Sequence, residues 1–289
     1  MIRADMAEQF FAPGSVIWRV HREMLLLIAG GRSLLMQIAH AKIAAGVAGH
    51  SRFQQDPLAR LQRTMSTMWS VVFDDAEQAR ESLRRVRAIH EKVRGTFGVG
   101  GEERASYSAL DPGLLLWVHA TLVDSALLAY ERFVGPLSAA DKIQYYEETK
   151  KLATLFDVPD AEIPPSFDDF RAYIDQMVGG GEIVVTATAR ALSRDILFPR
   201  VWFFRPARPL FTLVTVGLLP EKLRAAYDLS WDGRSEKRLR RFARLTRCLL
   251  PWVPPALRFA PQARAALKTT RRAPKKWAKN SALPAKNLD

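Results

Sequence analysis

The sequence predicts an all-α protein with a basic C-terminal extension. Apolar residues recur three and four positions apart in almost every segment, which is the spacing of one helix face. Along the 289 residues we find neither an alternation of strands with helices nor an internal repeat. With 48% hydrophobic and 25% charged residues, the composition is that of a globular protein able to bury a substantial core.

Three helices are expected in the first third of the chain. Residues 33–49 are apolar on nearly every side and predict one buried helix. Residues 56–73 start with an Asp–Pro pair, which suits a helix N-terminus. Residues 74–95 carry acids in the first turn and bases in the last, with Gly95 as the expected end.

A central helix is expected over residues 111–135, which repeat the Asp–Pro start and are apolar on almost every face. Ser138, followed three residues later by an Asp, has the spacing of a capping box and opens the next helix. The further helices are predicted over 138–156, 166–178 and 182–197, with one or two more within 223–253.

The net charge of +13 is unevenly distributed along the chain. From residue 234 onward there are 16 Lys and Arg against two acids, whereas the first 233 residues are nearly neutral. We therefore divide the chain into a helical domain, 1–233, and a basic C-terminal helix with a tail, 234–289, that is mobile beyond about residue 268. Such a tail suits anionic lipid headgroups. Nucleic acid is disfavoured, since the tail lacks interleaved aromatic residues and a known reading module.

The cysteine content and the N-terminus indicate a compartment. A single cysteine, Cys248, excludes a disulfide framework and favours a reducing environment. The N-terminus does not resemble a signal peptide, and no run of about 18 consecutive apolar residues predicts a membrane span. We expect a cytoplasmic protein that binds peripherally to the inner face of a membrane.

Histidines on apolar surfaces carry the chemical signal. His40, His90 and His119 each lie within an apolar helical pattern, and a buried imidazole needs a partner for its ring nitrogens. Arg87 and Arg94 lie one expected turn before and after His90. The apolar stripe around His90 consists of Leu83, Val86, Val93 and Phe97.

The residues alone leave the ligand of these histidines open. Zinc requires three or four close ligands, and no ligand pair at one-turn spacing is found. Non-haem iron is a second alternative. A haem requires one firm axial ligand, apolar helix faces and cations for its propionates, for which Arg87, Arg94, Arg60 and Arg63 are available. The plain alternative is a set of core histidines beside a solvated basic face.

Five blocks of sequence resemble the latex-clearing-protein (rubber oxygenase) and MpaB-like oxygenase family. They occur in the family's order and span roughly residues 13–230. The blocks are GSVIWRVHREMLLLIAGGRSLLMQIAH, GVAGHSRFQQDPLARLQRT, RVRAIHEKVRG, YSALDPGLLLWVHATLVDS and YERFVGPL.

The resemblance implies a globin-like helical bundle that carries one b-type haem. The family's arginine–x–x–histidine–x–x–x–arginine block matches Arg87, His90 and Arg94, so His90 is implied as the proximal iron ligand. A further family histidine near the haem pocket corresponds to His119. We add His40 to the candidate cofactor-binding residues because of its apolar surroundings in the sequence.

The distal block of the family, arginine–x–x–basic–threonine, matches Arg60, Arg63 and Thr64. In rubber oxygenase the basic residue is a lysine that can itself ligate iron, and here it is Arg63. A guanidinium stays protonated and offers no lone pair, which leaves the sixth position to water or dioxygen.

The family cleaves carbon–carbon double bonds in isoprenoid chains. The resemblance therefore implies a haem b-dependent oxygenase with dioxygen as co-substrate and a lipophilic, isoprenoid-like substrate. Two alternatives are a non-catalytic haem- or lipid-binding helical protein at a membrane surface, and a haem peroxidase.

Overall fold

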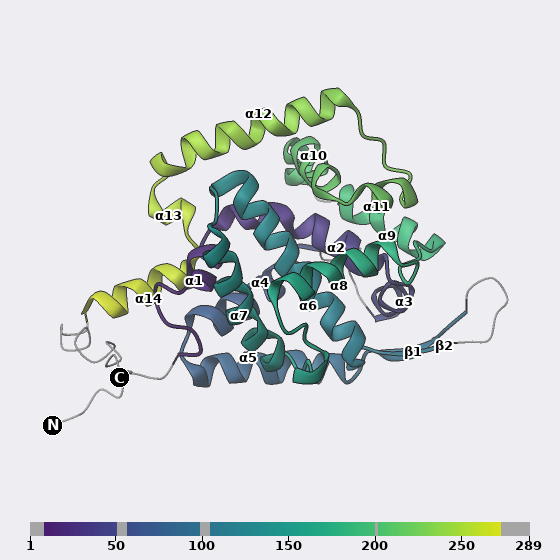
Figure 1. Cartoon of the computed structure of the whole chain (residues 1–289), viewed down its shortest axis with the longest axis horizontal. Helices are drawn as coiled ribbons and strands as arrows, with labels where there is room; N and C mark the ends of the chain where they lie inside the picture. The colour runs from purple at the N-terminus through teal and green to yellow at the C-terminus, as the bar shows by residue number, and fades with distance from the viewer. Residues whose placement is uncertain (1–8, 51–56, 99–104, 200–201, 273–289) are drawn as a thin grey trace, which may run out of the picture.

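The computed structural model describes residues 9–50, 57–98, 105–199 and 202–272, which are predominantly helical (Figure 1). This confirms the all-α prediction. The longer helices are α1 (Val16–His21), α2 (Gly30–Ile38), α3 (Ala41–His50), α4 (Pro57–Phe73), α5 (Ala76–His90), α6 (Pro112–Ala129), α7 (Ala139–Leu155), α8 (Phe167–Gly179), α9 (Ala187–Leu197), α10 (Arg208–Leu218), α11 (Glu221–Ala226), α12 (Gly233–Leu249), α13 (Pro255–Arg258) and α14 (Pro261–Arg272). Short 3-10 or π turns are η1 (Met24–Ala29), η2 (Tyr130–Val134), η3 (Asp160–Glu162), η4 (Trp202–Ala207) and η5 (Leu250–Trp252).

Helix α6 is the centre of the fold, as the pattern over 111–135 predicts. The carboxylate of Asp111 accepts hydrogen bonds from two backbone N–H groups of its first turn, at 3.0 and 3.3 Å. Trp117 is fully buried and donates its indole N–H to the carbonyl of Met36 on α2, at 3.2 Å. Pro112–Val134 is long and apolar enough to cross a membrane, but 78% of its most apolar window is buried in the protein. It is packed as the core helix.

A buried ionic network joins α6 to its neighbours. Asp124 on α6 accepts from Arg32 of α2 at 2.5 Å and from Arg171 of α8 at 2.8 Å. Arg32 also donates to the hydroxyl of Ser125 and to the carbonyl of Leu218 on α10, both at 2.7 Å. The network therefore fixes α2, α6, α8 and α10 relative to one another.

The prediction of a single helix over 33–49 is wrong. Helix α2 ends at Ile38, α3 starts at Ala41, and the segment bends by 109° between them. At the bend, the Nδ1 atom of His40 accepts a hydrogen bond from the backbone N–H of Lys42 at 3.2 Å. An N–H group of the first turn of α3 thus finds a partner that a continuous helix would not require.

The helices expected after residue 135 are confirmed, except at one start. Both α7 and α8 begin with a complete capping box, in which a serine and an aspartate three residues later bond each other's backbone N–H. Helix α9 begins at Ala187 rather than at 182. The β-branched residues 183–186 have no regular secondary structure instead, and the Thr186 side chain accepts from the N–H of Ala189 as the N-cap.

The prediction of a helix reaching Gly95 is also wrong. Helix α5 ends at His90, and the chain then forms strand β1 (Arg94–Phe97), which pairs antiparallel with β2 (Ala105–Ser108). This hairpin projects from the body (Figure 1) and was not expected from the sequence. Gly95 faces Tyr107 across the ladder, and a Cβ at this position would lie 2.7 Å from the tyrosine hydroxyl.

The basic C-terminal segment packs against the body as far as α14, where Ala263 is buried and Leu267 lies against the core. Leu239 and Ala243 of α12 are buried against η2 and α10. Glu23, itself buried, receives a bidentate pair of hydrogen bonds at 2.8 Å from Arg258, and α14 lies against α4. The described tail is therefore helical past residue 268, and the division at 233/234 stays a prediction. Residues 273–289 lie outside the described part.

Candidate functional site

His90 is the last residue of α5 and is half-buried. Burial lowers the pKa of its imidazole, and the nearby carboxylate of Asp157 opposes this shift. The ring is therefore neutral at pH 7 and keeps a lone pair on one nitrogen, as an axial metal ligand requires. The apolar stripe predicted around it is real only in part, because Val93 and Phe97 lie beyond the end of the helix.

The two flanking arginines occupy different structural settings. Arg87 is exposed and pairs with Asp157 at 2.6 Å and with Glu91 at 3.4 Å. Arg94 lies on β1, so it is not one helical turn from His90 as predicted. Its carbonyl oxygen lies 3.2 Å from Nε2 of His50. Any ligand that binds the Arg87 guanidinium must therefore compete with two carboxylates.

The distal block lies on α4, the antiparallel partner of α5. The hydroxyl of Ser82 donates to that of Ser70 at 3.0 Å, which fixes how the two helices face each other. Position 62 precedes Ser70 by eight residues on α4, and His90 follows Ser82 by eight residues on α5. Both therefore lie about 12 Å from this pair, in the same direction. The hairpin formed by α4 and α5 (the α4–α5 hairpin) therefore brings the distal block and His90 to the same end, which is the end away from its turn.

The side chains of the distal block are only partly described. Those of Arg63 and Thr64 are exposed, whereas that of Arg60 lies outside the described side chains. The carbonyl of Arg63 accepts hydrogen bonds from the hydroxyls of Ser66 and Thr67, at 2.9 and 3.0 Å. Both hydrogen bonds lie within one turn of α4.

His119 is the most unusual polar group of the core. It is 7% exposed, and its Nε2 atom has no hydrogen-bond partner within the described part of the chain. Burial lowers its pKa to about 4, and the nearby His21 adds to the shift. His21 differs in having a partner, since its Nε2 lies 3.0 Å from the hydroxyl of Tyr145. A neutral, buried and unpartnered imidazole nitrogen is suited to accept a ligand or an iron atom.

His40 is committed to the α2–α3 bend through its Nδ1 atom and lines a shallow pocket of about 260 Å³. Burial and the charge of Lys42 lower its pKa, against Glu182 and Asp111, which raise it. The pocket also holds Glu162 and is therefore polar rather than apolar. The structure does not place His40 beside either of the other two candidate histidines in this pocket.

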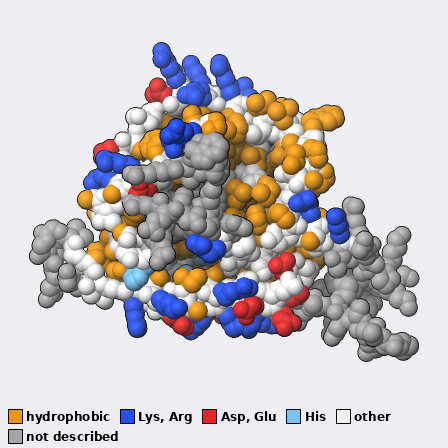
Figure 2. All heavy atoms as spheres, turned by 180° about the vertical axis from the view of Figure 1, so that it is seen from behind, with side chains coloured by type: hydrophobic (Ala, Val, Ile, Leu, Met, Phe, Trp, Pro, Cys, Tyr) orange, Lys and Arg blue, Asp and Glu red, His pale blue; other side chains and the backbone are white. Residues whose placement is uncertain are grey.

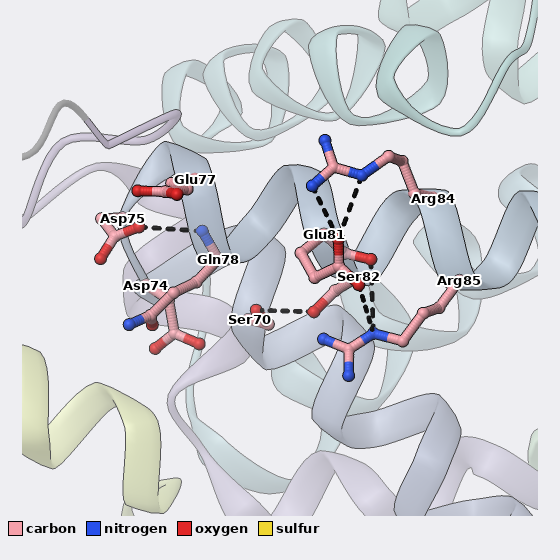
Figure 3. A pocket seen from close by; sticks show the side chains of 9 residues that line it. All are labelled: Ser70, Asp74, Asp75, Glu77, Gln78, Glu81, Ser82, Arg84 and Arg85. Carbon is pink, nitrogen blue, oxygen red and sulfur yellow. Dashed lines mark hydrogen bonds and ion pairs between the residues drawn. The ribbon is translucent and has the colours of Figure 1, made fainter.

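A larger hollow of about 570 Å³ lies at the turn of the α4–α5 hairpin (Figure 3), and sequence reasoning did not single it out. Burial and the charge of Asp75 raise the pKa of Asp74, while a hydrogen bond from Ser70 opposes them. The acidic residues at the start of α5 are the sequence feature that could have indicated this hollow. The lining residues are Ser70, Asp74, Asp75, Glu77, Gln78, Glu81, Ser82, Arg84 and Arg85. None of them is a predicted site residue, and the hollow is at the opposite end of the hairpin from His90.

The candidate ligands form no conventional metal site. Among the described residues, no three His, Cys, Asp or Glu side chains gather so that they could hold a metal ion. A haem iron differs from such an ion because the porphyrin supplies four ligands and the protein needs to supply one. His90 or His119 could supply such a single ligand.

Comparisons with known proteins support the family resemblance. Residues 18–248 match the family described as ER-bound oxygenase mpaB/B'/rubber oxygenase, catalytic domain. Two uncharacterized proteins, one of Mycobacterium tuberculosis and one of Mycobacterium bovis, are each 29% identical to this chain over 214 residues. The alignment covers 71% of this chain and 81% of each relative. No solved structure matches significantly.

Proposed function

This chain belongs to the mpaB/rubber oxygenase catalytic-domain family, and from that premise we propose that it is a haem b-dependent oxygenase that cleaves or oxidises a carbon–carbon double bond in a lipophilic, isoprenoid-like molecule. The observation that carries the proposal is the half-buried, neutral imidazole of His90 at the end of the hairpin where the distal block also lies. An oxygenase role follows from the family, and the haem and the substrate are the steps we add.

The donor chemistry of the chain fits a haem. His90 and His119 both present neutral imidazoles at pH 7, and the buried Nε2 of His119 has no partner among the described residues. His90 would hold the iron, with His119 as the alternative ligand. Arg87 would neutralise a propionate after leaving Asp157, and Arg94 would do so from β1. Bound haem would supply the redox chemistry that activates dioxygen.

On the distal side, the chain would contribute hydrogen-bond donors. Arg60 and Thr64 are one turn apart on α4 and therefore share a face. A guanidinium and a hydroxyl there would orient dioxygen and stabilise developing negative charge. Arg63 would add positive charge without competing for the iron.

The lipophilic substrate class rests on the apolar character of the molecule. Helix α6 is buried on almost every side by aliphatic residues, and Figure 2 shows a broad field of hydrophobic side chains on one face. Such surfaces select long apolar molecules by area and shape rather than by hydrogen bonds. We propose that the basic C-terminal segment keeps the enzyme at the inner face of an anionic membrane, where these substrates dissolve.

The haem assignment is tested by purifying the wild type and single variants from cells supplied with a haem precursor. His90→Ala should lose most of the Soret absorbance per mole of protein. The control Gln78→Ala, an exposed residue near the opposite end of the same helix, should keep it. Equal haem content in His90→Ala and wild type would contradict the assignment, and a loss confined to His119→Ala would transfer it to that residue.

The reaction is tested with the ferrous protein, labelled dioxygen and a panel of polyprenyl, carotenoid and unsaturated fatty compounds. Labelled carbonyl products, detected by mass spectrometry and absent with saturated analogues, are expected. Thr64→Ala and Arg60→Ala should retain haem and change autoxidation and dioxygen affinity. Turnover found only with hydrogen peroxide and generic electron donors would replace the oxygenase with a peroxidase.

A further inference from the structure

Helix α12 presents an outer face that the fold does not use. Its inner face is anchored by Leu239 and Ala243, which are buried against η2 and α10. On the N-terminal side, the carboxylate of Asp232 accepts from the backbone N–H of Ser235 at 2.7 Å and caps the helix. These contacts determine which face of α12 lies against the body and which face points to solvent.

The C-terminal end of this outer face is apolar and exposed. Leu245 and Leu249 are 55% and 53% exposed, and the two residues are one turn apart on α12. Just beyond them, Trp252 is 84% and Leu257 is 73% exposed. Four large apolar side chains thus face solvent within 13 residues of chain, which is unfavourable unless another surface covers them.

The rest of the outer face is cationic and largely unpaired. Arg240 pairs with Glu236 at 3.6 Å, but six other cations of α12 have no carboxylate within ion-pair distance in the part of the chain that the structure describes. These six are Arg234, Lys237, Arg238, Arg241, Arg244 and Arg247. Figure 2 shows Lys and Arg side chains projecting from the edge of the molecule along which α12 runs in Figure 1.

We propose that the outer face of α12, together with η5 and α13, is a docking surface for an anionic lipid bilayer. The guanidinium groups would contact lipid phosphates, while Trp252 and the leucines would enter the boundary between headgroups and acyl chains, where tryptophan is favoured. The apolar end would sit deepest, so that α12 tilts its C-terminal end toward the bilayer.

The same face fits other partners less well. The phosphates of a nucleic acid could pair with the arginines, but the three exposed leucines would stay in contact with water. The face also offers a single exposed aromatic ring for base stacking. A second copy of this chain would bring two cationic faces together, which is repulsive. The proposal rests on the membrane association included in the proposed function and assigns it to a folded face rather than to residues 273–289. It requires no haem, so it can fail independently of the oxygenase assignment.

Vesicle sedimentation of the full-length protein tests the charged half of the face. Binding is expected to phosphatidylcholine vesicles that contain phosphatidylserine, and to weaken at high salt. Arg241→Gln with Arg244→Gln should weaken it roughly 25-fold, at about fivefold for each charge removed. The matched control, Arg84→Gln with Arg85→Gln on α5 at the opposite side of the molecule (Figure 1), should bind like the wild type. Circular dichroism and thermal melting would establish that all variants are folded.

The single cysteine allows the apolar half to be tested directly. Cys248 is exposed on α12, and a nitroxide attached to it should become protected from a water-soluble relaxation agent when anionic vesicles are added. A label on Gln78→Cys of α5, in a Cys248→Ser background, should remain fully accessible. Trp252→Ala should reduce vesicle binding without reducing haem content.

Several results would overturn the proposal. These are unchanged binding in both the arginine and the tryptophan variants, equal weakening in the α5 control, or loss of binding only when residues 273–289 are deleted. Binding to single-stranded RNA that the same variants abolish, with no vesicle binding by the wild type, would overturn the choice of lipid as partner.

Vesicle binding by a haem-free preparation through this face would support the proposal. It would also show that the docking surface does not depend on the proposed oxygenase function.

Discussion

The central helix α6 and the end of the α4–α5 hairpin hold their charged groups in opposite ways. On α6, Asp124 is 4% exposed and is paired with two arginines from other helices. On the hairpin, Arg87 is exposed and shares carboxylates that solvent also reaches. Breaking the first arrangement would leave a buried charge without a partner, whereas the ion pairs of the second are exposed to solvent and contribute little to stability. His119 is an exception, because it is buried like Asp124 but its Nε2 atom has no hydrogen-bond partner among the described residues.

The largest effect is expected from breaking the network on α6. Arg32→Ala removes the deepest partner of Asp124 and leaves the Leu218 carbonyl without its donor, so the free energy of unfolding should fall by about 3–5 kcal/mol. Urea denaturation followed by circular dichroism measures this. Arg171→Ala removes the half-exposed partner of the same carboxylate and should cost about 1 kcal/mol. Equal losses would show that the network is not organised around Arg32.

The second prediction concerns pH and the unpartnered histidine. The pKa of His119 is about 4 in the folded protein, and its ordinary value is 6.5, so between these values the unfolded chain binds more protons. The free energy of unfolding should therefore decrease as pH falls below about 6.5, with a contribution of about 3 kcal/mol from His119 by pH 4. His119→Leu should make the pH profile of chemical denaturation shallower, whereas Leu127→Met on the same helix should not change it. An unchanged profile in His119→Leu would contradict the assignment.

The third prediction tests how closely the core around α6 is packed. Helix α2 approaches α10 through Gly31, where a Cβ would collide with the buried Thr215 and lie 2.7 Å from the ring of Phe211. Gly31→Ala should destabilise the protein by about 1–3 kcal/mol through overpacking. Gly30→Ala, next to it on the same helix, meets nothing within 4 Å and should be neutral or stabilise slightly. Similar melting temperatures for the two variants would indicate that α10 moves away freely.

The same comparison explains what the sequence could predict. Helices α6 and α7 could be predicted from the sequence because they obey local rules: an Asp–Pro start and continuous apolarity for α6, and a capping box at Ser138 for α7. The end of α5 was predicted wrongly because the helical spacing of apolar residues continues through Val93 and Phe97, although the helix ends at His90. Strand pairing between residues 94–97 and 105–108 is non-local and leaves little trace in a periodicity.

In the candidate site, too, some features can be predicted from the sequence and others depend on the tertiary structure. The family resemblance implied that His90 and the distal block serve one cofactor, and the structure places Arg63, Thr64 and His90 at one end of the α4–α5 hairpin. Their roles stay a prediction. No sequence pattern indicated that Nε2 of His119 lacks a hydrogen-bond partner among the described residues, since this depends on which side chains the neighbouring helices bring to it. The bend at His40 was missed for a similar reason, because a side chain that caps a helix start inside an apolar run looks like part of that run.

The smallest stability effect is expected at Arg87, where the comparison is sharpest. Its ion pairs with Asp157 and Glu91 are exposed, so Arg87→Ala should change the free energy of unfolding by less than about 1 kcal/mol, as Arg84→Ala should on the same helix. The two variants should differ in haem retention. If Arg87 exchanges Asp157 for a propionate, Arg87→Ala should release haem to an apomyoglobin acceptor several-fold faster than the wild type. Arg84→Ala, whose partner Glu81 lies toward the other end of the hairpin, should release it at the wild-type rate. A loss of several kcal/mol in Arg87→Ala would place this residue with Arg32 among the structural arginines, and identical release rates would remove it from the haem site.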